Sequence, residues 1–317
     1  MSTDCFRPMG RPRESEPHDM NDDVTDPATE AFVAHRDLLF TVAYEMLGSA
    51  ADTEDVLQEA WLRWVKVDQA QVRDQRAYLV RITTRQALNR LRTLKRRREA
   101  YVGPWLPEPL LTAPDVAEDV ELSENLSLAL MFILETLSPT ERAVFVLREV
   151  FDIDYDDVAA AIGKSPAAAR QIAYRARRHV DARRPRTQVF PEEARAALSS
   201  FQRALVTGDL QGLLTVLAPD VVFVSDGGGF KLAALQPVVG ADKVLRYMAG
   251  SVAKAGGAFT SEATTVNGNP GLILRLDGVI DGVLAFRVDN ARVSGLYYVR
   301  NPEKLTRVES ETPLTSR

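Results

Sequence analysis

The chain has 317 residues, a hydrophobic fraction of 45% and a formal net charge of −5, which is ordinary for a globular protein of two or three domains. No run of about 18 apolar residues occurs and the N-terminus has no apolar segment, so we expect neither a membrane span nor a secretory signal. The single cysteine, Cys5, excludes disulfides and cysteine-based metal sites within the chain, and with only three histidines we expect no metal and no cofactor.

The first part of the chain predicts a polar tail and then three helices. Residues 1–27 are polar and rich in proline, so we expect them to be disordered. Residues 28–98 carry apolar side chains at helical spacing in three stretches. The first stretch ends near Gly48, the second begins near Ala51 and the third covers about 75–98.

The third helix is strongly basic. Residues 73–98 contain ten lysines and arginines and one acid, Asp74. Such a charge predicts contact with a polyanion such as a nucleic-acid backbone, and a solvated charged face is the alternative. Five polar residues share one side at helical spacing: Arg81, Arg85, Asn89, Arg92 and Arg96.

Residues 99–134 form an acidic linker. They contain seven acids and no lysine or arginine, with four prolines between Pro104 and Pro114, and we expect helix only from about Asp119 onward. The linker could imitate nucleic acid or serve as a solvated spacer. Trp105 fits a spacer poorly, because an exposed tryptophan usually docks on a surface, and we predict that it docks on the C-terminal domain.

Residues 135–184 predict a helix-turn-helix. A capping box with Ser138 and Glu141 opens the first helix, Asp154 can cap the second, and Gly163 ends it. The third helix begins after Ser165, so that residues 155–181 match the arrangement that reads DNA.

The third helix of this unit has a polar, basic face. Near its N-terminus, Ser165, Arg170 and Gln171 are suited to base edges, whereas Arg175, Arg177 and Arg178 are suited to phosphates. A basic surface helix in an unrelated all-α protein is the alternative.

Residues 187–305 predict an α+β domain. Helices are expected at about 191–206, 209–217 and 241–254. Short strands are expected between the second and third of these helices and again from Phe259 onward, with turns such as Asn267-Gly268 between the later ones. Residues 306–317 are polar and predicted to be frayed.

Residues 28–181 resemble an extracytoplasmic-function sigma factor. The run from Asp52 to Trp61 is similar to the region 2 helix that binds the β′ clamp helices of RNA polymerase. The runs 76–92 and 137–180 resemble the parts of regions 2 and 4 that bind the −10 and −35 promoter elements. The resemblance implies RNA polymerase core, including its β flap, and promoter DNA as partners of a cytoplasmic protein. It implies three groups of site residues: Asp55, Gln58 and Glu59 for polymerase; Arg76, Arg81, Arg85, Asn89, Arg92 and Arg96 for the −10 element; Ser165, Arg170, Gln171, Arg175 and Arg178 for the −35 element.

The C-terminal domain resembles a SnoaL-like domain, a cone-shaped α+β barrel. Sigma factors with this fusion carry short motifs, and similar ones occur here at Trp105, Leu106, Pro107, Glu108 and Pro109, at Asp226, Gly227, Gly228 and Gly229, and at Asn301, Pro302 and Leu305. The resemblance implies that the domain contacts the sigma domains and regulates them in cis. One departure is Phe230, which stands before Lys231 where a basic residue would follow the glycines directly.

We therefore predict two all-α sigma domains and a SnoaL-like domain that together act as an alternative sigma factor without enzymatic activity. For the whole protein, a DNA-binding regulator with a ligand-sensing domain is the alternative. For the C-terminal domain, a small-molecule sensor and an enzyme using Asp226, Tyr297 or Tyr298 remain open, although the absence of histidine there weakens catalysis.

Overall fold

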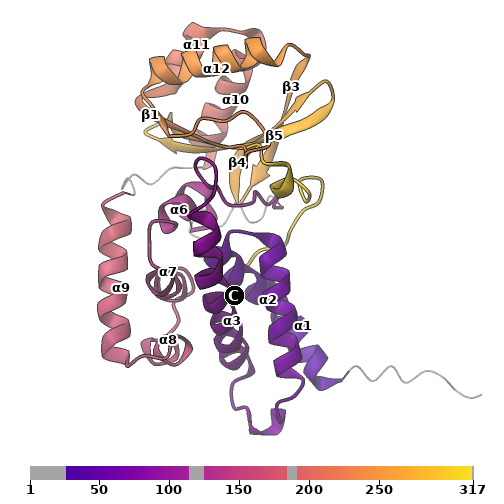
Figure 1. The fold of residues 1–317 in the computed structure, drawn as a ribbon, viewed down its shortest axis with the longest axis vertical. Coiled ribbons are helices and arrows are strands. Elements are labelled where there is room, and N and C mark those ends of the chain that lie inside the picture. Colours follow the sequence, from indigo (N-terminus) through magenta and orange to yellow (C-terminus); the bar gives the residue numbers. More distant parts are fainter. Residues whose placement is uncertain (1–25, 114–124, 184–190, 316–317) are drawn as a thin grey trace, which may run out of the picture.

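The computed structural model describes residues 26–113, 125–183 and 191–315. It has a helical half and a half that contains a sheet, with the linker between them (Figure 1). The helix onset predicted near Asp119 and the predicted disordered tail fall outside the described residues, except that Asp26 and Pro27 are described and begin the first helix.

The first helical unit has the three helices that the sequence predicts. The first helix ends where Gly48 adopts a left-handed conformation with φ 67°, and the second begins where the Ser49 side chain accepts a hydrogen bond from the backbone N–H of Asp52. The elements are α1 (Pro27–Leu47), α2 (Ala50–Trp64), the short 3₁₀ helix η1 (Gln69–Gln71) and α3 (Gln75–Arg98).

The second helical unit contains the predicted helix-turn-helix. The capping box of Ser138 and Glu141 is present, and Gly163 ends its helix with φ 69°. Asp154 stands at the N-cap position, but its side chain makes no capping hydrogen bond. The elements are α6 (Leu128–Leu134), α7 (Pro139–Phe145), the π-helical turn η2 (Val146–Val150), α8 (Tyr155–Ile162) and α9 (Pro166–Asp181).

The two helical units share one continuous apolar core. Arg142 of α7, only 2% exposed, donates from Nε and Nη2 to the backbone oxygen of Glu45 at 3.0 and 2.9 Å. Arg98 of α3 donates to the backbone oxygen of Leu47, and both arginines pair with Glu135. The cations thus satisfy carbonyls at the C-terminal end of α1, where positive charge is favoured, and tie α3 and α7 to it.

The C-terminal domain has a six-stranded sheet in the order β2-β1-β6-β5-β4-β3. The pair β1–β6 is parallel and the other neighbours are antiparallel. Asn267 and Asp277, both at φ 51°, form the predicted hairpin turns. The elements are α10 (Pro191–Thr207), α11 (Leu210–Val216), β1 (Leu217–Asp226), β2 (Val238–Val239), α12 (Ala241–Ala255), β3 (Phe259–Val266), β4 (Asn269–Leu276), β5 (Val279–Asp289), β6 (Arg292–Val299) and the 3₁₀ helix η3 (Pro302–Lys304).

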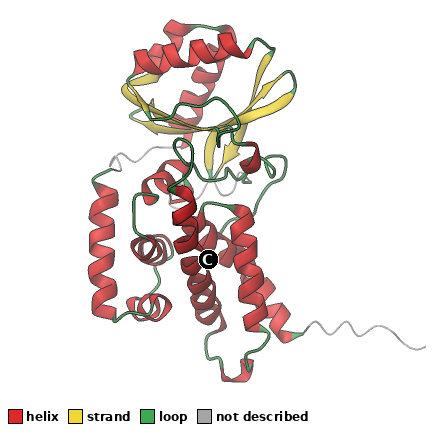
Figure 2. Ribbon diagram, in the orientation of Figure 1, coloured by secondary structure: helices red, strands yellow, loops and turns green. Residues whose placement is uncertain are grey.

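The sheet is open, with β2 and β3 as its edges, rather than closed into a barrel. Helices α10, α11 and α12 cover one face (Figure 2). The other face packs on the linker and on α6 through a second apolar cluster that includes Leu106, Leu128 and Tyr297. Because both faces are buried, the strands alternate between two sets of apolar partners.

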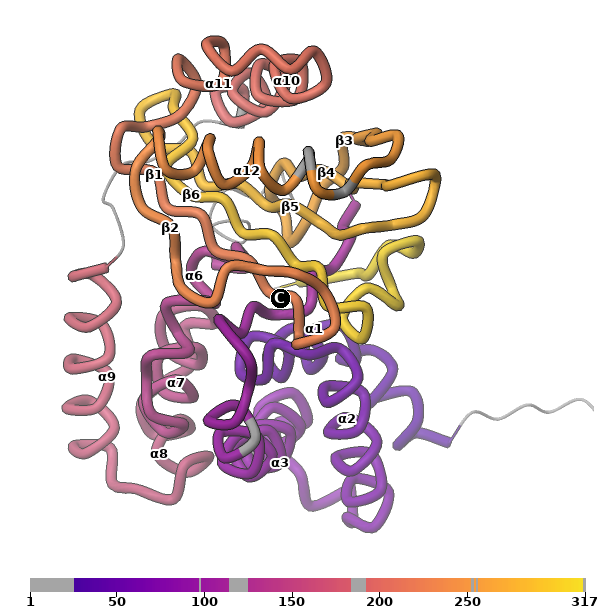
Figure 3. Tube along the Cα trace, turned by 45° about the horizontal axis from the view of Figure 1, so that its top comes forward, coloured from indigo at the N-terminus to yellow at the C-terminus, as the bar shows by residue number. Residues whose placement is uncertain are grey.

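The segment after Leu305 packs against the rest of the chain and is not frayed as far as Thr315. It passes between the sheet and the first helical unit (Figure 3). Val308 and Leu314 are 1% and 6% exposed, and the backbone N–H of Thr312 donates to the oxygen of Leu111 at 2.7 Å. These apolar side chains and backbone hydrogen bonds dock a segment whose overall polarity had predicted fraying.

Candidate nucleic-acid interface and linker site

The predicted −10 face of α3 lies largely in solvent. Five of its six residues are exposed, and Arg81 is half-buried with its guanidinium 4.8 Å from the centre of the Tyr78 ring. Tyr78 packs in turn on Trp64, which is fully buried and donates from Nε1 to the oxygen of Ala28. The exposed five are Arg76, Arg85, Asn89, Arg92 and Arg96.

Part of this face contacts the second helical unit. The Nη2 of Arg85 donates to the backbone oxygen of Ala160 in α8 at 2.7 Å, and α3 packs along α8. A duplex or strand that used Arg85 would have to displace α8. The arrangement of the two units is therefore closed over one end of the predicted nucleic-acid surface.

The predicted −35 face of α9 is exposed over its whole length. Arg170, Gln171, Tyr174 and Arg175 line one shallow depression on it. Ser165 is the N-cap and accepts from the backbone N–H of Ala168, which leaves its hydroxyl proton available. These donors point outward from one helix, as groove recognition requires.

Some of the cations on α9 are already paired. Arg177 makes a bidentate ion pair with Glu149 at 2.6 and 2.9 Å, which raises the pKa of its guanidinium, so it is not a free phosphate ligand. Arg175 lies 3.9 Å from Glu141, and the guanidinium of Arg178 stands 5.8 Å from the Tyr174 ring centre.

The predicted polymerase-binding residues form an exposed stripe on α2. Asp55, Gln58 and Glu59 all reach solvent. Asp55 also pairs with Arg90 at 3.1 Å, and Glu59 accepts from Gln86 at 2.8 Å. Both partners belong to α3, so the acidic stripe and the basic helix hold each other in place.

The linker is buried between the two halves of the molecule. Leu106 and Leu110 have no exposed surface and Glu108 is 5% exposed. The Glu108 carboxylate accepts the backbone N–H of Ala50 at 2.7 Å, which fills an unpaired donor at the start of α2; burial nevertheless raises the pKa of Glu108. The solvated-spacer alternative does not describe this part of the linker.

A chain of hydrogen bonds runs from α1 through the linker into the sheet. The Tyr44 hydroxyl donates to the oxygen of Glu108 at 2.5 Å and accepts from Asn267 Nδ2 at 2.8 Å. Asn267 Oδ1 accepts the backbone N–H of Leu110 at 3.0 Å. Buried networks of this kind fix a unique arrangement when every member is satisfied.

Trp105 lies between the first helical unit and the C-terminal domain. The Arg98 guanidinium stands 3.6 Å from its ring centre and Lys304 Nζ stands 4.0 Å from it, which places two cations on one indole. A side chain at Gly48 would collide with this ring. Trp105 therefore contacts the C-terminal domain, as the sequence predicted, and also the first helical unit.

Asp226 anchors the linker to the C-terminal domain. It is fully buried and accepts from the Tyr101 hydroxyl at 2.6 Å, the backbone N–H of Leu106 at 2.8 Å and Lys304 Nζ at 2.7 Å. Burial lowers the pKa of Lys304 to about 8, against the opposing effect of Asp226. Burial and the bond to Asp226 raise the pKa of Tyr101.

The glycines after Asp226 make a turn that other residues could not form. Gly228 and Gly229 have φ 62° and 80°. A Cβ on Gly227 would lie 2.1 Å from the oxygen of Lys231, and one on Gly228 would lie 2.4 Å from the Asn301 side chain. The predicted turn is present, and it brings the motif at Asn301 against the motif at Asp226.

Asn301, two residues after the end of β6, bonds both Asp226 and the linker. Its backbone N–H donates to the oxygen of Asp226 at 3.0 Å and its Nδ2 donates to the Tyr101 hydroxyl at 2.9 Å. The sequence did not predict roles for Lys304 and Tyr101. In the sequence, the position of Lys304 inside the motif that begins at Asn301 and the position of Tyr101 four residues before Trp105 were the only indications of these roles.

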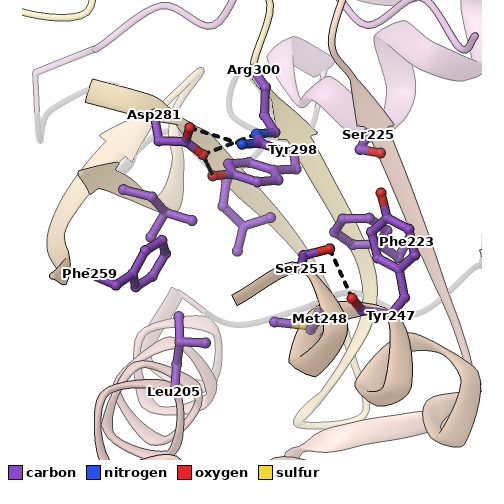
Figure 4. Close-up of a pocket in the computed structure, with 12 residues that line it drawn as sticks. Leu205, Phe223, Ser225, Tyr247, Met248, Ser251, Phe259, Asp281, Tyr298 and Arg300 are labelled. Carbon is purple, nitrogen blue, oxygen red and sulfur yellow. Dashed lines mark hydrogen bonds and ion pairs between the residues drawn. The ribbon is translucent and has the colours of Figure 1, made fainter. Parts of the chain in front are cut away.

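A pocket lies between the sheet and α12 (Figure 4). At its polar end Asp281 accepts from Arg300 Nε and Nη2, from Lys231 Nζ and from the Tyr298 hydroxyl. Burial opposes ionisation of Asp281, but these hydrogen bonds together lower its pKa to about 2. The sequence named neither Asp281 nor Arg300; of the three catalytic candidates, only Tyr298 lines the pocket.

The described residues contain no cluster of three or more His, Cys, Asp or Glu side chains placed to hold a metal ion. Within the same residues, no helix combines the length and the apolar character needed to cross a bilayer.

Two family models match the helical half. Sigma-70 region 2 matches residues 31–97 and Sigma-70 region 4 matches residues 127–180. These spans contain all but the last residue of α3 and of α9, with the two basic faces described above.

Similar proteins extend over nearly the whole chain. The ECF RNA polymerase sigma factor SigJ of Mycobacterium tuberculosis is 37% identical over 288 residues, which are 87% of this chain and 92% of SigJ. A probable ECF RNA polymerase sigma factor of the same species, SigI, is 31% identical over 90% of this chain and 97% of its own length. The crystal structure of SigJ superposes with a TM-score of 0.72 and 35% identity over 90% of this chain and 99% of that one.

Proposed function

The chain belongs to the extracytoplasmic-function sigma factors, which direct RNA polymerase to promoters, and we propose that its SnoaL-like domain inhibits this activity in cis through the linker. The observation that carries the proposal is the burial of Leu106 and Glu108, with Glu108 bonded to α1 and α2 and Leu106 bonded to Asp226. Holding the linker there keeps the first helical unit, region 2, packed on the second, region 4, with Arg85 bonded to α8.

We further propose which partner each exposed face binds in the complex with polymerase. The basic face of α3 would hold the −10 strand, since it presents Arg76, Arg92 and Arg96 to solvent. The face of α9 would read the −35 element through Arg170 and Gln171. The α2 stripe would bind the β′ clamp helices, and region 4 would bind the β flap.

The test is run-off transcription with purified core polymerase and the full-length chain, comparing Leu106→Asp with Val102→Asp. Both variants add one negative charge to the linker, but at positions of different burial. Leu106 is fully buried at the linker site, whereas Val102 is 57% exposed. We expect Leu106→Asp to release the linker and raise transcription several-fold while Val102→Asp leaves it unchanged. Equal transcription from both variants would overturn cis regulation. A decrease in transcription with Leu106→Asp alone would show that the C-terminal domain activates the sigma factor instead of inhibiting it.

We propose that the C-terminal domain has no catalytic role. Asp226 is occupied by the linker and Lys304, and Tyr297 packs on the linker face of the sheet. Asp281 lies in the pocket, but a carboxylate with a pKa of about 2 is a weak general base at neutral pH.

A further inference from the structure

The pocket of the C-terminal domain has a polar end and an apolar body. Figure 4 shows Asp281, Tyr298 and Arg300 joined at one end, while Leu205, Met248 and Phe259 lie at the other. The cavity is about 80 Å³, about half the size of an engineered apolar cavity that binds benzene. Its occupant must therefore have a small apolar body.

The polar end offers donors rather than acceptors. Arg300 uses three of its five N–H groups, two toward Asp281 and one toward the oxygen of Leu232. Lys231 does not line the pocket, but it donates to the lining residue Asp281, and its side chain is 33% exposed. The two cations face one carboxylate, so the cluster carries a net positive charge. A ligand group that accepts hydrogen bonds and carries negative charge complements both properties.

From this chemistry we infer that the pocket binds a short-chain carboxylate, with its apolar chain against Met248 and Phe259 and its carboxylate at Arg300. Tyr247 rises from α12 beside Phe223, with ring centres 5.3 Å apart, and walls the cavity. The regulatory consequence of binding, though not binding itself, rests on the proposed cis inhibition.

The pocket and the linker site share two strand ends. On β1, Ser225 lines the pocket and the next residue, Asp226, holds the linker. After β6, Arg300 lines the pocket and the next residue, Asn301, bonds Tyr101. The backbone N–H of Arg300 donates to the oxygen of Asp226 at 2.7 Å. A ligand that draws Arg300 away from Asp281 therefore displaces the residues that grip the linker.

Binding is tested on the full-length chain by calorimetry and ligand-observed NMR, with isovalerate as the probe and isovaleramide as its neutral match. We expect one isovalerate site and at least tenfold weaker binding of the amide. Absence of isovalerate binding would overturn the site, and equal binding of the two probes would overturn its carboxylate chemistry.

Three variants locate the probe. Ser251→Phe fills the cavity from α12 and should abolish binding, whereas Ala249→Phe, on the exposed side of the same helix, should leave it unchanged. Lys231→Met removes the surplus positive charge at a partly exposed position and should weaken isovalerate about tenfold with little effect on the amide. Binding that survives Ser251→Phe would place the probe elsewhere and overturn the assignment.

Coupling is read at the linker by hydrogen exchange of the Leu106 amide, which donates to Asp226. Saturating isovalerate should speed this exchange several-fold in the parent chain and not in Ser251→Phe. An unchanged rate despite binding would overturn the coupling. If Leu106→Asp leaves transcription unaltered while isovalerate still binds, the cis inhibition fails and the pocket assignment stands.

Discussion

At the scale of single residues, the buried pair of Lys304 and Asp226 joins the linker to the C-terminal domain. Lys304 Nζ bonds both Asp226 and the backbone oxygen of Leu106, and it lies over the Trp105 ring. Breaking a buried ion pair by removing one partner leaves an uncompensated charge. The stability of the docked state should therefore depend on both members together.

Lys304→Met should lower the free energy of unfolding by about 3 kcal/mol, because the buried carboxyl of Asp226 then loses its cationic partner. Urea denaturation of the single and double variants with Asp226→Asn should give a coupling energy of at least about 1 kcal/mol. Lys243→Met, at an exposed lysine of α12, is the control and should change stability little. Strictly additive effects of the two changes would show that the pair is not coupled.

Glu45 predicts a pH dependence of stability. Its carboxylate is fully buried and neither oxygen has a hydrogen-bond partner among the described residues. Burial raises its pKa to about 8, and Arg142 offsets only part of this. The unfolded chain releases this proton above about pH 4.3, so across the window up to pH 8 the folded state binds more protons and stability falls as pH rises.

Glu45→Gln should therefore flatten the decrease in stability between about pH 5 and pH 8 and stabilise the chain at the upper end. Thermal unfolding at several pH values measures this. Glu30→Gln, at an exposed position of the same helix, should keep the parent slope. If stability decreases with pH as steeply in Glu45→Gln as in the parent chain, Glu45 is ionised in the folded state over this whole pH range.

At the scale of elements, the basic helix α3 has two tasks in the proposed account. Its apolar side belongs to the common core, and its outer face combines free cations with Arg85, which is bonded to α8. Arg92 is the better probe of nucleic-acid binding, because its one hydrogen bond to a described residue is to Asn89 of the same helix.

Arg92→Glu should reduce open-complex formation about tenfold at low salt, with a smaller deficit as salt is raised, because reversal replaces attraction to phosphate by repulsion. Permanganate footprinting of the −10 region measures promoter melting. Arg292→Glu makes the same charge change on an exposed strand end of the C-terminal domain and should have no effect. Equal melting by both variants would remove α3 from the −10 interface.

The helices were predictable because their ends carry local signals. Gly48, Gly163 and the capping box of Ser138 set helix ends through contacts within a few residues of the chain. The hairpin turns at Asn267 and Asp277 are equally local. The open sheet and the docked segment after Leu305 depend on distant partners, which no local pattern reports.

The same division holds for the candidate sites. Charge and spacing predicted which faces of α3 and α9 are exposed. The partners of Asp226 lie as far as 125 positions away, so the sequence indicated its motif but not the roles of Tyr101 and Lys304. Asp281 lies in β5 and Arg300 follows the end of β6, so the two meet only in the folded domain.

At the scale of the whole molecule, we propose that the C-terminal domain holds the two sigma regions together. The linker and the segment after Leu305 both lie between the sheet and the helical half (Figure 3). Regions 2 and 4 then share one core, with Arg142 and Arg98 bound to α1. Polymerase binding is expected to supply contacts that compensate for separating the two regions.

The most direct test is the distance between the two sigma regions in solution. Spin labels on cysteines at Thr93 and Lys164, both exposed, with Cys5→Ser to remove the native thiol, report it by double electron–electron resonance. The account predicts a short, narrow distribution in the free chain and a longer one with core polymerase. It also predicts a shift toward longer distances with Leu106→Asp alone. Two results would contradict the claim that the C-terminal domain holds the regions closed: long distances in the free chain, or a distance distribution that Leu106→Asp does not change.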